Sequence, residues 1–345
     1  MINIGIIGAG RIVEWFIKDY LLIMNNINVQ SRIISIWNRT YEKANLINDK
    51  YNLNLNVYQN LNDFFNKDRN NIDLIYIGTS DESHFDFVKT ALENKINVFC
   101  EKPLSLSYLQ SKELYKLANK NDLLLFEGIK TGFAPAFIKL EQIIKSELLG
   151  RIKYIYSSHA KISTSGNIPN DSNVGFHLAG GMYALYTVLK LAGKAKVVQF
   201  MNNAYEKNTL AIQTSVLTIR HSNNVISTVV GSDTITDDLS TKIIFEKGYA
   251  KLGGRIDLYN ENYKKDSCHM PKTLSIYDNQ NNLLDFYDLD FVSEGEGLRF
   301  EIEHVLEMLN DNIKESSIVS QSLSLEIIKI LEKTNKVSDL ESVVL

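Results

Sequence analysis

The chain begins Met1-Ile-Asn-Ile-Gly-Ile-Ile-Gly8-Ala-Gly10, a short apolar run that ends in two closely spaced glycines. Such a run is typical of a buried parallel strand. From Arg11 to about Met24 the apolar side chains then recur at helical spacing. Strand, glycine turn and helix in this order predict a dinucleotide-binding unit, because the turn lets backbone N–H groups at the start of the helix approach a pyrophosphate.

The alternation of strand and helix patterns continues to about residue 125. Further strands are expected at 32–37, 72–77, 96–100 and 123–127, with helices at 41–52, 86–94 and 106–119. After Gly150 the pattern changes to period-two strands at 151–160, 196–201, 211–220, 225–231 and 241–246, with helices at 181–191, 301–310 and 323–333. The two halves are therefore expected to be built differently.

We predict an α/β protein. Residues 1–125 are expected to form an N-terminal Rossmann domain with a doubly wound parallel sheet. Residues 126–310 are expected to form an α+β domain for substrate binding and oligomerisation, with a large, mostly antiparallel sheet. Residues 311–345 are expected to be a C-terminal helical segment that closes the fold. A chain of 345 residues is longer than one hydrophobic core usually covers, which agrees with two main domains.

Composition and charge argue against several classes of function. The net charge of −4 gives no basic footprint for a nucleic acid. No run approaches the ~18 apolar residues that span a bilayer, and the start lacks a secretion signal, so we expect a cytoplasmic protein without a membrane partner. Cys100 and Cys268 are too few and too far apart in the sequence to predict a disulfide framework. No metal site is expected, since the histidines show no ligand spacing.

The glycine turn is the first candidate cofactor site. Gly8 and Gly10 are expected to hold the pyrophosphate, together with Arg11 and Ile12 at the start of the helix. Val13 stands where the usual fingerprint has a third small residue. An incomplete fingerprint also fits a merely tight turn, but the strand before it and the helix after it favour the cofactor.

The end of the second strand bears on the choice of nucleotide. NAD sites usually carry an acidic residue there, which binds the adenosine ribose. This chain has Asn38, Arg39 and Thr40 instead, and an arginine with a neighbouring hydroxyl suits a 2′-phosphate. The alternative is an exposed, solvated arginine. We therefore favour NADP and leave NAD open.

Two polar segments close the third and fourth strands, at the sheet edge where such folds bind ligands. They are Gly78-Thr79-Ser80-Asp-Glu-Ser-His84 and Cys100-Glu101-Lys102-Pro103. Together they resemble the Gfo/Idh/MocA family of oxidoreductases, whose hallmarks are a Glu-Lys-Pro triplet and an upstream Pro-Asn-x-x-His loop. Here the triplet is intact and His84 is in register, whereas Ser80 and Asp81 replace the proline and the asparagine.

The resemblance runs nearly end to end and implies roles for these residues. It includes Phe133-Ala-Pro135, Leu148-Leu-Gly150-Arg-Ile and Phe300-Glu-Ile-Glu. In the family, the lysine of the triplet lies beside the nicotinamide and the reacting oxygen, which implies a catalytic and binding role for Lys102. A structural salt bridge is the alternative. Thr79, Ser80 and Glu101 are expected to contact the cofactor, and His84 to order the loop around it.

The family's second catalytic segment aligns with Asn173-Val-Gly-Phe-His177-Leu-Ala179-Gly-Gly181-Met-Tyr183. The match at Tyr183 implies a proton donor whose pKa is tuned by Lys102, with an aromatic packing residue as the alternative. Ala179 replaces the acidic residue of the family, so a relay through that carboxylate is absent. His177 is a candidate on the substrate side, although a structural or surface histidine fits better without a visible partner.

A loop after the fifth strand adds Lys130 and Thr131, which are expected to reach the substrate. The whole pattern predicts reversible hydride transfer between NADP(H) or NAD(H) and a carbinol or carbonyl carbon of a sugar, cyclitol or related polyol. Two alternatives stay open. One is a relative that keeps its cofactor bound while it cleaves or epimerises a sugar, and the other is a catalytically silent nucleotide-binding or sensing protein.

The second domain also suggests an assembly. An antiparallel sheet with helices on one face leaves its other face in need of cover. Members of the resembled family commonly pair through such a face, which implies a homodimer or a homotetramer.

Overall fold

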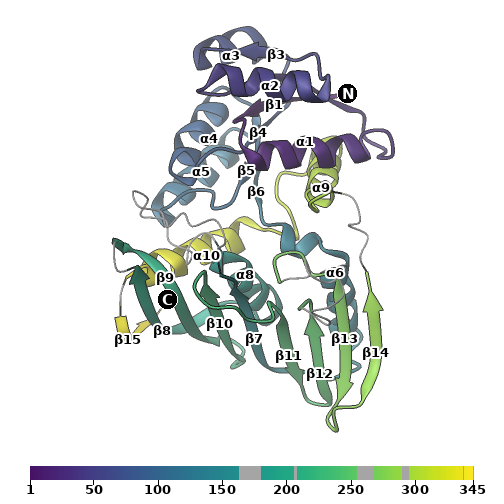
Figure 1. Cartoon of the computed structure of the whole chain (residues 1–345), viewed down its shortest axis with the longest axis vertical. Coiled ribbons are helices and arrows are strands. Elements are labelled where there is room, and N and C mark those ends of the chain that lie inside the picture. The colour runs from purple at the N-terminus through teal and green to yellow at the C-terminus, as the bar shows by residue number, and fades with distance from the viewer. Residues whose placement is uncertain (163–179, 206–207, 255–267, 290–294, 337, 345) are drawn as a thin grey trace. The chain divides into compact units, whose positions relative to one another are not determined.

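The computed structural model describes residues 1–162, 180–205, 208–254, 268–289, 295–336 and 338–344. The chain divides into two compact units (Figure 1). Unit 1 comprises Met1–Ile129 and Glu294–Ile328, and unit 2 comprises Lys130–Ser293 and Lys329–Leu345. The sequence predicted three consecutive segments instead, and the difference arises because residues 294–328 return to the N-terminal unit.

The described residues of unit 1 form a six-stranded parallel sheet in the order β3-β2-β1-β4-β5-β6. Its strands are β1 (Ile2–Ile7), β2 (Ser31–Trp37), β3 (Asn56–Tyr58), β4 (Leu74–Ile77), β5 (Asn97–Glu101) and β6 (Leu125–Gly128). Its helices are α1 (Arg11–Ile23), α2 (Tyr41–Tyr51), α3 (Leu61–Asp68), α4 (His84–Glu93), α5 (Tyr108–Lys120) and α9 (Arg299–Asn310), with the short η1 (Asp81–Ser83). Figure 1 shows α4 and α5 on one face of the sheet and α1 with α9 on the other. The predicted doubly wound parallel sheet is confirmed.

The return of α9 to unit 1 has a local cause. Asp19 of α1 is fully buried and accepts hydrogen bonds from the backbone N–H groups of Glu296, at 2.8 Å, and Arg299, at 3.1 Å. Gly295 approaches so closely that a Cβ there would lie 2.3 Å from the Asp19 carboxylate. A carboxylate that binds free N–H groups at a helix start caps that helix, so Asp19 fixes α9 against α1.

Unit 2 is built on a nine-stranded sheet of its described residues, in the order β14-β13-β12-β11-β7-β10-β9-β8-β15. Its strands are β7 (Ile152–Ala160), β8 (Ala195–Tyr205), β9 (Asn208–His221), β10 (Ile226–Ser232), β11 (Thr241–Phe245), β12 (Gly248–Leu252), β13 (Thr273–Asp278), β14 (Leu283–Asp288) and β15 (Ser338–Val344). Only β7 and β10 pair in parallel among these described strands, so the prediction of a mostly antiparallel sheet is confirmed.

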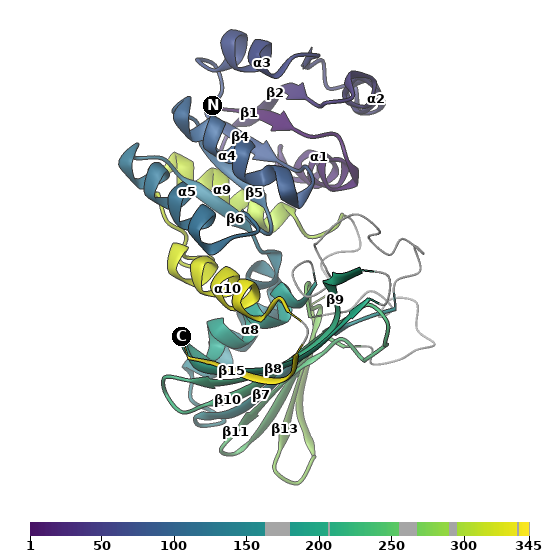
Figure 2. The same cartoon turned by 90° about the vertical axis from the view of Figure 1, so that its left-hand side faces the viewer.

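Helices cover one face of this sheet (Figure 2). The helix α8 (Gly181–Ala192) packs on β7 and β10, and α6 (Pro135–Lys145) packs on β12 and β13. The short η2 (Lys130–Phe133) contacts both helices. The boundary between the units falls inside α10 (Gln321–Thr334).

Several elements were not expected from the sequence. They are β3, α3, α6 and the four strands β12 to β15. Two of them show why: β3 has three residues, too few to show a period, and β14 is exposed along most of its length, so its side chains do not alternate. The 311–345 segment is also not purely helical, because it ends in β15, which pairs with β8.

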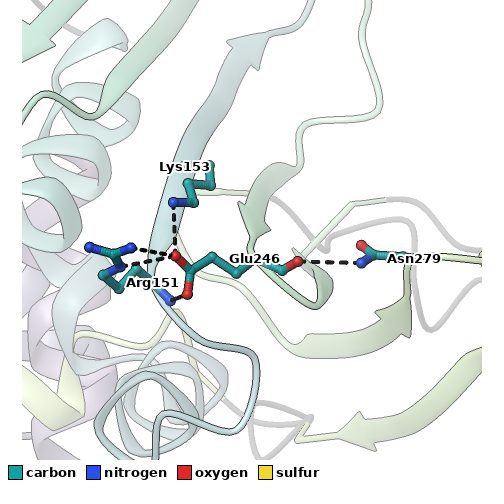
Figure 3. A network of polar contacts seen from close by, with 4 residues as sticks. All are labelled: Arg151, Lys153, Glu246 and Asn279. Carbon is teal, nitrogen blue, oxygen red and sulfur yellow. Dashed lines mark hydrogen bonds and ion pairs between the residues drawn. The ribbon is translucent and has the colours of Figure 1, made fainter.

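A polar network joins the start of β7 to the turn between β11 and β12 (Figure 3). The Glu246 carboxylate accepts from the side chains of Arg151, at 2.9 Å, and Lys153, at 2.8 Å. Its backbone carbonyl accepts from Asn279 at 3.3 Å. Gly150 has a φ of +74°, and a Cβ there would lie 2.7 Å from the carboxylate, so the glycine makes room for the network.

Among the described residues, no helix combines the length and apolar character needed to cross a bilayer.

Candidate active site

The turn between β1 and α1 requires glycine at Gly8. Its φ is +120°, and a Cβ would lie 2.4 Å from the backbone oxygen of Gly78 at the end of β4. Gly10 is the N-cap of α1 and makes no side-chain cap, and a Cβ there would meet no described atom within 4 Å. Open space therefore lies beside Gly10, the residue that precedes the first N–H groups of α1, at Arg11 and Ile12. A pyrophosphate fits this arrangement, because these N–H groups bind anions.

Gly78 explains why Val13 can stand where the usual glycine fingerprint has a third small residue. Val13 is fully buried, and its Cγ2 lies 2.8 Å from the position that a Cβ on Gly78 would occupy. The third glycine of the usual fingerprint allows close packing of helix on strand. Here the small residue stands on the strand side of the contact, so the valine is tolerated.

The end of β2 presents the three residues predicted to select the nucleotide. The Asn38 amide donates to the Thr40 carbonyl at 2.8 Å, which shapes the turn into α2. Arg39 and Thr40 are exposed. Thr40 is the N-cap of α2 without a side-chain hydrogen bond to that helix. An exposed guanidinium and an exposed hydroxyl thus follow β2 at the carboxyl edge of the sheet.

The segment after β4 is tied to the Glu-Lys-Pro loop. Ser83 places its hydroxyl 2.8 Å from Oγ1 of Thr79 and 2.7 Å from the backbone oxygen of Ser80. The buried His84 ring lies with Nδ1 2.7 Å from the Pro103 carbonyl oxygen. Because a carbonyl only accepts, Nδ1 carries the proton and donates it. His84 thus fixes the backbone that follows Lys102, where the Lys102–Pro103 peptide is cis.

Three carboxyl groups surround this loop. Glu101 ends β5 and accepts from the Tyr76 hydroxyl at 2.8 Å. Glu127 on β6 accepts from the Leu104 N–H at 2.7 Å and from the Ser324 hydroxyl. Burial raises the pKa of Asp81 and the pKa of Glu127, while the nearby charge of Lys102 lowers both. The loop that carries Lys102 is therefore held by buried hydrogen bonds on both sides.

Of the predicted substrate-side residues, Lys102 belongs to unit 1 and the others to unit 2. Lys130 and Thr131 belong to η2 and are buried, and the Thr131 hydroxyl donates to the backbone oxygen of His269 at 3.0 Å. Tyr183 lies in the first turn of α8 and is partly exposed. His177 and Ala179 lie outside the described residues.

The structure also places residues that sequence reasoning missed, His159, His269 and Cys268, around the predicted Tyr183. The rings of His159, Tyr183 and His269 contact one another, and Cys268 lies beside His159. They come from β7, from α8 and from the segment before β13, so no local sequence motif predicts that they lie together.

The described part of the chain holds no group of three or more His, Cys, Asp or Glu side chains arranged to bind a metal ion.

Comparison with known proteins identifies the class of this fold. Residues 2–129 match the family model described as oxidoreductase family, NAD-binding Rossmann fold. The chain is 23% identical to trans-1,2-dihydrobenzene-1,2-diol dehydrogenase of Xenopus tropicalis over 95% of its own length and 96% of that protein. It is 25% identical to the uncharacterized oxidoreductase YgjR of Escherichia coli (strain K12) over 58% of its own length and 61% of that protein.

A solved structure agrees with the whole architecture. An oxidoreductase from Agrobacterium radiobacter, determined in complex with NAD+, L-tartaric acid and magnesium, superposes with a TM-score of 0.80 at 15% identity. The match covers 99% of this chain and 98% of that one, and it shows the shared fold. The protein is thus a two-unit oxidoreductase with an NAD(P)-binding Rossmann domain. Residues 2–129 belong to the Gfo/Idh/MocA family of oxidoreductases with an NAD-binding Rossmann fold, as the motifs of this region predicted.

Proposed function

We propose that this protein interconverts a carbinol and a carbonyl group on a sugar, cyclitol or related cyclic polyol, with NADP(H) as its preferred cofactor. The observation that carries the proposal is the pairing of an open helix N-terminus at Gly10 with an intact, firmly held Glu101-Lys102-Pro103 loop at the same sheet edge. The similarity along 95% of the chain to a diol dehydrogenase supports the choice of a hydroxyl-bearing substrate.

The residues of unit 1 fit the cofactor. The N–H groups that start α1 bind the pyrophosphate, and the glycines before them leave room for it. Arg39 and Thr40 bind the 2′-phosphate of NADP through charge-assisted hydrogen bonds. When bound, the nicotinamide cofactor would supply the hydride-transfer chemistry.

Lys102 and Tyr183 act on the reacting oxygen of the substrate, Lys102 on its charge and Tyr183 on its proton. The Lys102 ammonium stabilises negative charge that develops on the reacting oxygen. Tyr183 donates the proton to that oxygen in the reducing direction and takes it back in the oxidising direction. The two side chains belong to different units, and mutagenesis tests whether they act on one oxygen.

Turnover of a defined panel tests the reaction. We expect NADP+ to be reduced with at least one of D-xylose, myo-inositol and trans-1,2-dihydrobenzene-1,2-diol. Lys102→Ala and Tyr183→Phe should each lower kcat by ~10²-fold or more, and the double variant should be little worse than the poorer single one. Lys112→Ala, an exposed lysine of α5, is the matched control and should be unchanged.

Two other outcomes would replace this proposal. Product formation without net change of the nucleotide would indicate a tightly held cofactor that is regenerated in each cycle. Nucleotide binding without turnover of any panel compound would indicate a silent binding protein.

The cofactor preference is tested separately by thermal stability. NADP+ should stabilise the protein more than NAD+ at equal concentration, and a tenfold difference in Kd corresponds to ~1.4 kcal/mol. Arg39→Ala should remove most of the difference, whereas Arg69→Ala, an exposed arginine at the end of α3, should preserve it. Equal stabilisation of the wild type by both nucleotides would contradict a 2′-phosphate site.

The uncovered face of the unit 2 sheet supports a homodimer or a homotetramer. Met201 of β8 is 53% exposed and Val216 of β9 is 38% exposed, and the two residues are paired across the strands. Ile226 at the start of β10 is 41% exposed. Paired apolar side chains of this kind are normally covered by another protein surface. Light scattering should give a multiple of the monomer mass, and Met201→Glu with Val216→Glu should lower it.

A further inference from the structure

Two histidines flank Tyr183 within unit 2. The ring centroids of Tyr183 and His159 are 5.6 Å apart, and those of Tyr183 and His269 are 5.5 Å apart. The two imidazoles are themselves 5.3 Å apart and nearly perpendicular. Each ring of this group, which we call the His–Tyr–His cluster, therefore contacts the other two. All three residues are only partly buried, so solvent reaches part of each.

Separate contacts hold each member of the cluster in place. Sγ of the buried Cys268 lies 3.3 Å from Nδ1 of His159. The buried Thr131 hydroxyl donates to the backbone oxygen of His269 at 3.0 Å. Gly231 of β10 is paired with His159, and a Cβ on Gly231 would lie only 3.3 Å from Cα of Gly181, the first residue of α8. Because glycine lacks this Cβ, the start of α8, which carries Tyr183, packs closely on the sheet. Because a separate contact fixes each of the three residues, the cluster is a defined part of unit 2.

The cluster matches a chemical need of the proposed reaction. When Tyr183 gives its proton to substrate it becomes a tyrosinate, and it must regain a proton before the next turnover. Imidazole changes charge near neutral pH, since its unperturbed pKa is about 6.5. Among the described residues, the elements packed on α8 bring a small set of other ionisable groups: Lys130 from η2 and Lys153, Tyr154 and Tyr156 from β7. The strand β10 brings none.

We propose that His159 and His269 form a proton relay that recharges Tyr183 and positions its ring. This inference rests on the proposed function, because it assumes that Tyr183 is the proton donor. In the reducing direction an imidazolium of the cluster passes its proton to the tyrosinate and becomes neutral. Solvent, which reaches the partly exposed cluster, then returns a proton to the imidazole. In the oxidising direction the same protons move the opposite way, and no oxidant or reductant beyond the nucleotide is needed.

Kinetics of the full-length protein give the first test. We expect His159→Gln and His269→Gln each to lower kcat by about tenfold or more on the panel compound that turns over, with KM changed less than twofold. Added imidazole should restore some of the lost kcat, which a purely structural defect would not allow. In the oxidising direction kcat should rise as pH increases through the range in which imidazole loses its proton. The double variant, with both histidines replaced by Gln, should lose this rise. His304→Gln, in unit 1, is the matched control and should keep the wild-type profile.

A second measurement needs no substrate and separates this inference from the proposed function. Tyrosine labelled at Cζ is followed by NMR during a pH titration, and Tyr183→Phe identifies the signal. The Tyr183 signal should shift as the histidines titrate, and the shift should vanish in the double His→Gln variant. Absence of the shift in the wild type would overturn the relay, whatever the activity. A clear shift with no turnover of any panel compound would retain the cluster coupling and overturn the reaction.

Discussion

The two units build their candidate functional groups in different ways. In unit 1 the groups are mostly backbone: the N–H groups at the start of α1, the glycine turn before them, and a loop held by His84 and Glu127. In unit 2 they are side chains gathered from three separate segments, His159, Tyr183 and His269. A backbone site tolerates many side chains but few changes of backbone shape, whereas a side-chain cluster depends on each member and on what holds it.

The largest expected effect tests the backbone site. Gly8→Ala places a methyl group 2.4 Å from the Gly78 oxygen at a φ of +120°, so the backbone must move. We expect a loss of about 3 kcal/mol of unfolding free energy and loss of nucleotide binding. Gly10→Ala is the control: its Cβ enters open space, so stability should fall by about 1 kcal/mol or less while nucleotide affinity still falls strongly. Equal loss of stability in both variants, measured by denaturant unfolding, would contradict this distinction.

A somewhat smaller effect is expected at the support of the Lys102 loop. Glu127→Ala leaves the Leu104 N–H without its acceptor and should cost about 2 kcal/mol, whereas Glu127→Gln keeps an acceptor of the same shape. Burial raises the pKa of Glu127 above its ordinary value of 4.5, so the folded state binds this proton more tightly than the unfolded chain does. Its contribution is full below pH 4.5 and is lost as pH rises through the raised pKa. Stability of the Gln variant should therefore fall less over that range, and parallel pH curves for both proteins would refute the assignment.

A third variant probes how the side-chain cluster is held. Thr131→Val keeps the shape of the buried side chain but removes the hydrogen bond to the His269 carbonyl. We expect a loss of about 1 kcal/mol in unfolding free energy. The NMR signal of Tyr183 should move in this variant, because the ring beside it is no longer anchored. Thr228→Val, on β10, removes a hydroxyl that pairs with Tyr154 instead and should leave the Tyr183 signal in place.

The smallest effect is expected at the network of Figure 3, whose residues belong to neither candidate site. Hydrogen bonds from Lys153 and Arg151 lower the pKa of Glu246 to about 2. A lowered carboxyl pKa stabilises the fold above the ordinary value of 4.5, and that contribution is lost as pH falls toward about 2. Glu246→Gln should raise the pH at which acid unfolds the protein and should change stability little at neutral pH, because exposed ion pairs contribute little. High salt should reduce the difference, and an unchanged acid midpoint would show that the network is not coupled to unfolding.

The contrast between the units also explains what sequence reasoning reached. The strand, glycine turn and helix at the N-terminus, the alternation that follows, and the Glu101-Lys102-Pro103 triplet are contiguous patterns. Local geometry decides the first two: a tight turn demands glycine, a buried strand demands apolar residues, and parallel strands bring their carboxyl ends to one edge. The triplet was recognised by its resemblance to the family. The sequence by itself therefore determined the Rossmann domain, its family and the expected position of the nucleotide.

Only the tertiary structure decided the features that depend on distant partners. Val13 fits because Gly78 of another strand makes room, and α9 returns to unit 1 because the buried Asp19 caps it. The His–Tyr–His cluster exists because β7 and β10 pair in parallel beneath α8, which no periodicity in either strand reveals. Contacts between remote segments follow from strand order and close packing, and these are properties of the folded chain as a whole.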